Sequence, residues 1–167
     1  DDNFFDKQIN LGLDLQGGSY LLLEIDNKPV ITQRLQNTVS ILRKYFKNQN
    51  IKYKDLLLKD NESIIFLIDK NQVDSVKKRF EDKDSEINPY YPNYKYHQFD
   101  LEIIDNRFIL QFSKYGLIEI KNSSLDQALE IVRRRIDEVG TNEPNILKRG
   151  NDRILVELPG LDDPMRI

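Results

Sequence analysis

The amino-acid sequence predicts an α+β protein in which one part of the chain is inserted into another. Three patterns support this class. Apolar residues recur every three or four positions over 125–139, which is typical of an amphipathic helix. Two short strand-like segments, 145–149 and 153–158, follow that helix on either side of a turn. Upstream, residues 27–116 carry helix and strand patterns of their own.

The helix pattern has recognisable signals at both ends. Ser124 and Gln127 have the spacing of a capping box, which predicts that the helix begins at Ser124. Gly140 suits the left-handed conformation that ends many helices, and Pro144 prevents an early return to helix. Residues 117–123 are compatible with either a strand or an earlier start of this helix. The apolar positions that share one helix face are Leu125, Leu129, Val132, Ile136 and Val139.

Near the N-terminus, a glycine-rich stretch interrupts a strand pattern. Leucines alternate with other residues over 11–16, Gly17 and Gly18 follow, and the strand pattern continues over 20–25. The stretch lacks the spacing and the Lys-Ser/Thr pair of phosphate-binding loops, and no helix is placed to offer its N-terminus to an anion. We therefore expect one bent strand where another backbone comes close, with an added interaction role as the alternative.

The middle of the chain, 27–116, predicts an αββαββ subdomain that can close a core of its own. The outer residues, 1–26 and 117–167, predict a base that reads β-α-β-β. That order is most of a split βαβ, or ferredoxin-like, sheet, which is incomplete in this chain. The predicted elements of the subdomain are a helix over 31–46, a hairpin of 51–59 and 63–68, a short helix over 73–80, an irregular segment over 81–98 and a hairpin of 99–104 and 107–112.

Composition excludes several classes of function. Hydrophobic residues make up 39% and charged residues 32% of the 167 residues, as in an ordinary globular chain. The net charge of −3, with both signs interspersed, gives no basis for binding nucleic acid. No apolar run is long enough to span a membrane, and without cysteine there is neither a disulfide nor a thiolate metal site. Because the only methionine is Met165, we expect a segment of a longer protein.

The sequence carries no catalytic, cofactor-binding or metal-binding pattern, so we expect a protein that is not an enzyme. His97 is the only histidine and has no nucleophile signature near it. Arg133 and Arg134 have acidic residues four positions away, which predicts a solvated helix face. Arg135 is expected to make its contacts outside the helix, with the sheet or with other parts of the protein.

Half of the eight tyrosines lie close together in the irregular segment, at Tyr90, Tyr91, Tyr94 and Tyr96. The prolines between and beside them predict a loop that stays outside helix and sheet. Such rings can offer large amphipathic surfaces to an unfolded polypeptide. The alternative interpretation is that the rings fold onto the sheet of the subdomain itself.

Two long motifs resemble one known family. The segments RRRIDEVGTNEP and NDRILVELPGLDD, and the segment INLGLDLQGGSYLLLEID at 9–26, resemble the SecD family of accessory subunits of the bacterial Sec translocase. The resemblance covers the two ends of the chain, whereas the residues between them are interpreted on their own. The motif positions, which we expect to act in structure or interaction, are Leu11, Gly12, Leu13, Asp14, Leu15, Gln16, Gly17, Gly18, Arg135, Gly140, Glu143, Pro144, Arg153, Glu157, Pro159 and Gly160.

The resemblance implies the periplasmic part of a subunit that is anchored in the inner membrane by helices before and after this segment. It implies that the whole protein works with SecF beside the SecYEG channel and uses the proton-motive force to draw unfolded preproteins outward. It implies no cofactor, and for residues 117–123 it favours helix. The alternative is a periplasmic domain of another exporter of the resistance-nodulation-division type, whose members use similar βαβ folds.

Overall fold

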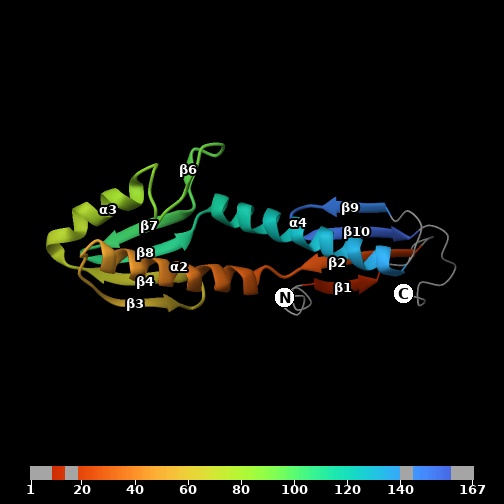
Figure 1. The fold of residues 1–167 in the computed structure, drawn as a ribbon, viewed down its shortest axis with the longest axis horizontal. Helices are drawn as coiled ribbons and strands as arrows, with labels where there is room; N and C mark the ends of the chain where they lie inside the picture. The colour runs from red at the N-terminus through yellow and green to blue at the C-terminus, as the bar shows by residue number, and fades with distance from the viewer. Residues whose placement is uncertain (1–8, 14–18, 140–144, 159–167) are drawn as a thin grey trace. The chain divides into compact units, whose positions relative to one another are not determined.

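The structure is a computed structural model that describes residues 9–13, 19–139 and 145–158. It is a mixed α+β fold with antiparallel sheets, as the sequence predicted (Figure 1). The chain divides into two compact units. The outer unit comprises Asp1–Pro29 and Ile120–Ile167, and the inserted unit comprises Val30–Glu119. The described residues of each unit form a four-stranded sheet of their own.

The sheet of the outer unit has the strand order β1-β2-β10-β9, and every neighbouring pair is antiparallel. The predicted hairpin of β9 and β10 is confirmed, and Gly150 adopts a left-handed conformation in its turn, at φ 64°. Because β10 lies between β2 and β9, strands from opposite ends of the chain form one sheet. The strands are β1 (Ile9–Leu13), β2 (Ser19–Ile25), β9 (Asn145–Arg149) and β10 (Arg153–Leu158).

The N-terminal strand pattern forms two strands, so the prediction of one bent strand is wrong. Ile9 pairs with Ile25 and Leu13 with Leu21 in an antiparallel ladder, which means that the chain reverses direction between β1 and β2. The alternation at Leu11 and Leu13 and the apolar run that follows Tyr20 were true strand signals, but neither reveals whether a chain continues or turns back. The motif positions Asp14, Leu15, Gln16, Gly17 and Gly18 lie outside the described residues.

Helix α4 (Lys114–Val139) begins earlier than its capping pattern predicted. Residues 117–123 are helical, as the family resemblance favoured. Ser124 is buried within the helix, so the predicted capping box is wrong. A serine is tolerated inside a helix when apolar residues such as Ile120, 3% exposed, continue the buried face upstream. The predicted end signals, Gly140 and Pro144, lie outside the described residues.

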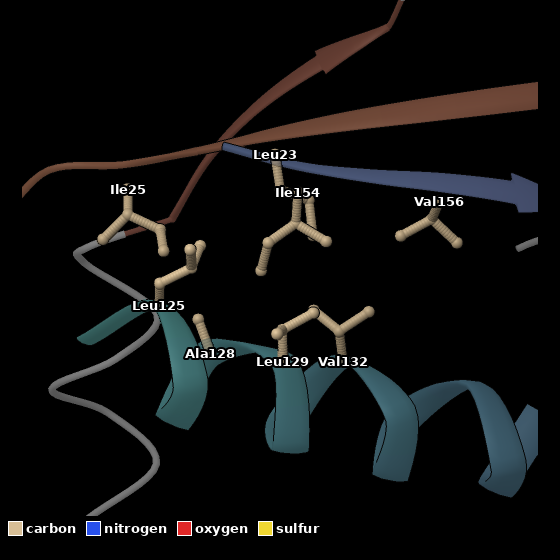
Figure 2. Packing of buried hydrophobic residues seen from close by; sticks show 8 residues of the cluster. All are labelled: Leu23, Ile25, Leu125, Ala128, Leu129, Val132, Ile154 and Val156. Atoms are coloured by element: carbon tan, nitrogen blue, oxygen red, sulfur yellow. The ribbon is translucent and has the colours of Figure 1, made fainter. Parts of the chain in front are cut away.

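Helix α4 packs against one face of the outer sheet. Figure 2 shows its apolar side chains pointing toward those of β2 and β10. Burying one such aliphatic side chain stabilises a fold by roughly 1.5–3 kcal/mol, whereas an isolated helix is only marginally stable in water. The contact between helix and sheet therefore holds the outer unit together. The buried residues of this core are Leu23, Ile25, Leu125, Ala128, Leu129, Val132, Ile154 and Val156, with Ile136 packed beside them.

The inserted unit has the predicted order of main helices and strands. Its sheet has the strand order β3-β4-β8-β7, again antiparallel throughout. Helix α2 (Lys28–Asn48) precedes the sheet, and a short 3-10 turn leads into α3 (Val73–Glu81) between β4 and β7. The strands are β3 (Tyr53–Lys59), β4 (Ser63–Ile68), β7 (Phe99–Ile104) and β8 (Arg107–Phe112).

Buried phenylalanines from both helices and two central strands form the centre of the inserted unit. The ring centroid of Phe66 on β4 lies 5.3 Å from that of Phe46 on α2 and 6.0 Å from that of Phe80 on α3. Phe108 on β8 lies 5.2 Å from the same ring. All four side chains are fully buried, and ring pairs at such separations add roughly 0.5–1.5 kcal/mol beyond burial. Phe66 thus joins α2, α3 and the sheet.

Gly116, in the first turn of α4, occupies a position that has no room for a side chain. Its backbone N–H donates to Ser113 Oγ at 3.1 Å, and a Cβ at Gly116 would lie 2.4 Å from the backbone oxygen of Gln98. We predict that Gly116→Ala lowers the free energy of unfolding by roughly 1–3 kcal/mol, the usual effect of overpacking, even though alanine favours helix. Urea denaturation measures this change.

Asn122→Ala is the matched control for that substitution, because Asn122 is exposed on the same helix. It should leave the urea midpoint unchanged or slightly higher, since alanine has the better helix propensity. If Gly116→Ala had the midpoint of the unsubstituted chain, the close approach of Gln98 would be contradicted.

Candidate interaction surface

A small antiparallel hairpin carries the clustered tyrosines. Strand β5 (Tyr90–Tyr91) pairs with β6 (Tyr96–His97), so the prediction that this segment stays outside any sheet is wrong. The prolines do not prevent pairing, because they lie just outside the two short strands. Pro89 precedes β5 and accepts a hydrogen bond from the backbone N–H of Gln98 at 2.8 Å. Lys95 adopts a positive φ of 54° in the turn.

The rings of this hairpin contact one another and the start of α4. Tyr91 and Tyr94 lie 6.0 Å apart between ring centroids, and Tyr94 stacks on Tyr115 of α4 at 4.8 Å. Tyr96 lies 5.4 Å from the same Tyr115 ring. Tyr115 was not predicted as part of this group, because a single tyrosine at a helix start does not reveal which rings it meets. We name Tyr90, Tyr91, Tyr94, Tyr96 and Tyr115 the tyrosine cluster.

Two carboxylates hold hydroxyl groups of the cluster. Tyr94 donates to Glu119 Oε1 at 2.9 Å, and Tyr96 donates to Asp100 Oδ1 at 2.8 Å. Each hydrogen bond raises the pKa of its tyrosine above the ordinary 10.0, because the neutral phenol is the donor and the carboxylate disfavours a phenolate. Burial raises the pKa of Tyr91, and the charge of Glu119 raises it further.

Buried polar contacts fix the hairpin to the sheet. Asn88 is 3% exposed, and its Nδ2 donates to the backbone oxygens of Phe80 at 3.0 Å and Phe99 at 3.3 Å. Its Oδ1 accepts from the backbone N–H of Phe99 at 2.9 Å. Ser113 Oγ donates to the backbone oxygen of His97 at 2.6 Å, and Nε2 of His97 contacts another backbone oxygen at 2.9 Å. His97 therefore has a structural role in positioning the hairpin.

The tyrosine cluster is partly packed and partly open to solvent. Tyr96 is 45% exposed, whereas Tyr90, Tyr91 and Tyr94 are half-buried. The ring contacts are with one another, with His97 and with Tyr115 of α4, rather than with the sheet onto which one interpretation folded them, and each ring of the hairpin keeps some accessible surface. A contact between this surface and an unfolded polypeptide stays a prediction.

The family-motif positions that the structure describes lie in the outer unit. On β10, Arg153 stands opposite Glu24 of β2, and Glu157 stands opposite Tyr20 of β2. These positions lie where strands from the two ends of the chain pair. The described positions are Leu11, Gly12 and Leu13 in β1, Arg135 on an exposed part of α4, and Arg153 and Glu157 in β10. Gly140, Glu143, Pro144, Pro159 and Gly160 lie outside the described residues.

Within the described ranges, no group of three or more His, Cys, Asp or Glu side chains could hold a metal ion. None of the helices in that part of the chain is both long enough and apolar enough to cross a membrane.

Comparison with protein families gives matches at both ends of the chain. Residues 4–29 match the SecD/SecF GG motif. Residues 125–167 match the N-terminal part of the P1 domain of protein translocase subunit SecDF. These matches coincide with the two regions that carried the resemblance in the sequence. No solved structure matches the chain.

Curated relatives match nearly the whole chain. Protein translocase subunit SecD of Rickettsia bellii is 38% identical over 156 residues, which cover 93% of this chain and 28% of the relative. SecD of Rickettsia typhi is 35% identical over the same shares. SecD of Acetobacter pasteurianus is 34% identical over 164 residues, or 96% of this chain and 30% of that relative.

The matches at both ends and along nearly the whole chain define a segment of a protein translocase subunit. Within that class, the chain belongs to the SecD family, as its motifs predicted. It spans less than a third of the length of the relatives described above, at 28% to 30%.

The contact between Tyr94 and Glu119 gives a testable pH dependence. Because the pKa of Tyr94 is raised above 10.0 in the folded state, the contact stabilises the fold at lower pH, and that stabilisation is lost as pH rises through the raised pKa. We predict that Glu119→Gln moves the pKa of Tyr94 and of Tyr91 back toward 10.0. Titration of the tyrosine ring signals by NMR measures both values.

Glu62→Gln serves as the control, because Glu62 is exposed in the turn between β3 and β4. It should leave the tyrosine titration unchanged. Unaltered pKa values of Tyr91 and Tyr94 in Glu119→Gln would show that Glu119 does not hold the cluster.

Proposed function

We propose that this chain is the periplasmic part of a Sec translocase accessory subunit that assists the proton-motive-force-dependent export of preproteins across the inner membrane. The observation that carries the proposal is the similarity to SecD over 93% of this chain, with family matches at both ends. Because the chain spans 28% of that relative, the anchoring of the whole protein, its work with SecF and SecYEG and its periplasmic position all belong to the proposal.

The architecture supports a role in binding and in transmitting force rather than in catalysis. In the outer unit, β10 lies between β2 and β9. Helix α4 packs its apolar side chains against those of the sheet. This topology supports an incomplete ferredoxin-like base formed by 1–26 and 117–167. The separate sheet and aromatic core of the other unit support an inserted subdomain at 27–116.

The tyrosine cluster is the surface that we propose for contact with the exported chain. Its rings are held by Asn88, Ser113 and Tyr115, so they are presented on a fixed hairpin. Part-exposed aromatic rings can meet many apolar side chains without requiring one sequence, which suits clients of varied sequence.

Site-specific photo-crosslinking tests that contact. A probe in place of Tyr96, the most exposed ring of the hairpin, should crosslink to a reduced, unfolded preprotein. A probe in place of Glu62, in the β3–β4 turn, is the control and should give little product. Equal yields at the two positions, or product only at Glu62, would remove the cluster from the proposed function.

Export by the full-length protein tests the proposed function itself. Expressed in bacteria depleted of SecD, the full-length protein that contains this chain should reduce the accumulation of unprocessed preprotein, as measured by pulse labelling. Val132→Asp should abolish this effect, because it places a charge in a helix–sheet core where Val132 is 7% exposed. Glu130→Gln, on the exposed face of the same helix, should retain it. Stable full-length protein that leaves preprotein accumulation unchanged would contradict the proposal.

A further inference from the structure

The sheet of the inserted unit has one face that packs on helices and one open face. Strand residues alternate between the faces, and directly paired residues share a face. Phe66 and Phe108 pair with each other and contact the helical rings, which defines the packed face. Their neighbours Ile65 and Ile109 also pair with each other and therefore lie on the opposite face.

Aliphatic side chains occupy the middle of this open face. The register places Leu57 of β3 beside Ile65, and Ile65 beside Ile109. Leu57 is 47% exposed and Ile104, at the end of β7, is 53% exposed, although both are large hydrophobic residues. We name Leu57, Ile65, Leu67, Ile104 and Ile109 the aliphatic face. Ile65, Leu67 and Ile109, which lie on the two central strands, are half-buried.

Charges of opposite sign flank the aliphatic face on its two edge strands. Lys54 and Lys59 lie on the open face of β3, where they pair with Leu67 and Ser63. Asp100 and Glu102 lie on the open face of β7, at the other edge of the sheet. All four charged residues are exposed. The open face therefore has lysines on one edge strand, carboxylates on the other, and a row of aliphatic residues, Leu57, Ile65 and Ile109, that crosses the sheet between polar residues.

We infer that the open face binds a second copy of this chain, with the two sheets packed face to face about a two-fold axis parallel to the strands. An interface with two-fold symmetry uses the same patch on both subunits, so the patch must be complementary to itself. Rotation about this axis sets the basic β3 edge of one subunit over the acidic β7 edge of the other, and does so twice. Rotation about an axis across the strands would set each edge over its own copy, where like charges repel.

The register gives the expected contacts of this dimer. Lys59, Ser63, Gln111 and Asp100 form one row across the sheet. The two-fold axis therefore places Lys59 against the partner subunit's Asp100, and Ile65 against the partner subunit's Ile109. The same register places Leu57 against the partner subunit's Glu102, so Lys59 with Asp100 is the one directly opposed charge pair at each edge. Packed sheets lie about 10 Å apart with strand directions within about 30°, so aliphatic side chains of this size fill the space between them.

Arg107 is the one charged residue in a central strand of this face, and it begins β8 at the rim. Its register partners across the sheet are Leu67 and Ile104. A long arginine stem can cover apolar surface while the guanidinium group stays in water. Arg107 is thus compatible with a buried aliphatic centre.

Sedimentation equilibrium of the 167-residue chain tests the dimer. The unsubstituted chain should associate to a dimer as its concentration rises. Ile109→Glu, which puts a carboxylate at the centre of the interface, should raise the dissociation constant at least about tenfold, while Ile109→Val should change it little. Circular dichroism checks that both variants are folded.

A charge exchange tests the orientation with substitutions of exposed residues, of which Asp100 also accepts the hydrogen bond of Tyr96. The variant Lys54→Glu with Lys59→Glu has two acidic edges, and the variant Asp100→Lys with Glu102→Lys has two basic edges. Each variant by itself should be monomeric where the unsubstituted chain is dimeric, because like charges meet at both edges. A mixture of the two variants should form a heterodimer, since acidic edges then meet basic edges on both sides.

Three outcomes would overturn the inference. One is an unsubstituted chain that stays monomeric at the highest concentration reached. Another is a dimer that persists in either charge variant alone. The third is a mixture of the two variants that forms no heterodimer, or that still forms one after Ile109→Glu is added to both.

Discussion

The outer unit depends on the pairing of two strands that lie far apart in the sequence. Strand β2 lies near the N-terminus and β10 near the C-terminus, and their ladder runs from Arg153 opposite Glu24 to Leu158 opposite Ser19. Helix α4 covers the same sheet with Leu125, Leu129 and Val132, so one apolar core joins both ends of the chain. Without this core, the β-α-β-β elements would not form a stable unit, because an isolated helix and an isolated hairpin are both only marginally stable in water.

This closure explains how the fold carries a large insertion. Closing a loop costs entropy that grows only slowly with its length, so a long insertion is tolerated if its own residues fold. The inserted unit meets that condition through Phe66 and the rings around it. Asn88 then fixes the segment between α3 and β7 with three backbone hydrogen bonds, which lets a short tyrosine hairpin keep a defined conformation.

The two proposed surfaces of the inserted unit differ in their chemistry. The tyrosine cluster is aromatic, and carboxylates hold two of its hydroxyl groups. The aliphatic face has branched side chains between a basic and an acidic edge. The first suits a partner without fixed structure, because an amphipathic ring accepts many contacts. The second suits a partner of defined shape, because opposite charges at fixed positions select one orientation. The two surfaces meet at Asp100, which accepts the hydrogen bond of Tyr96 and lies on the acidic edge of the aliphatic face.

By itself, the sequence determined the fold class, the main helices and hairpins of the inserted unit, the helix face at Leu125, Leu129 and Val132, and the SecD family. These follow from local periodicity, turn residues and long motifs, all of which are properties of neighbouring residues. Only the tertiary structure decided that β1 turns back to pair with β2, that α4 begins at Lys114, and that Tyr115 joins the tyrosine cluster. The place of Tyr115 depends on a partner distant in the chain, whereas β1 pairs with the next strand and only the reversal between them was hidden. Ser124 and the alternating residues near the N-terminus have the same local pattern whichever residues pack against them. Packing therefore decides whether Ser124 caps a helix or lies inside one, and whether the N-terminal strand continues or turns back.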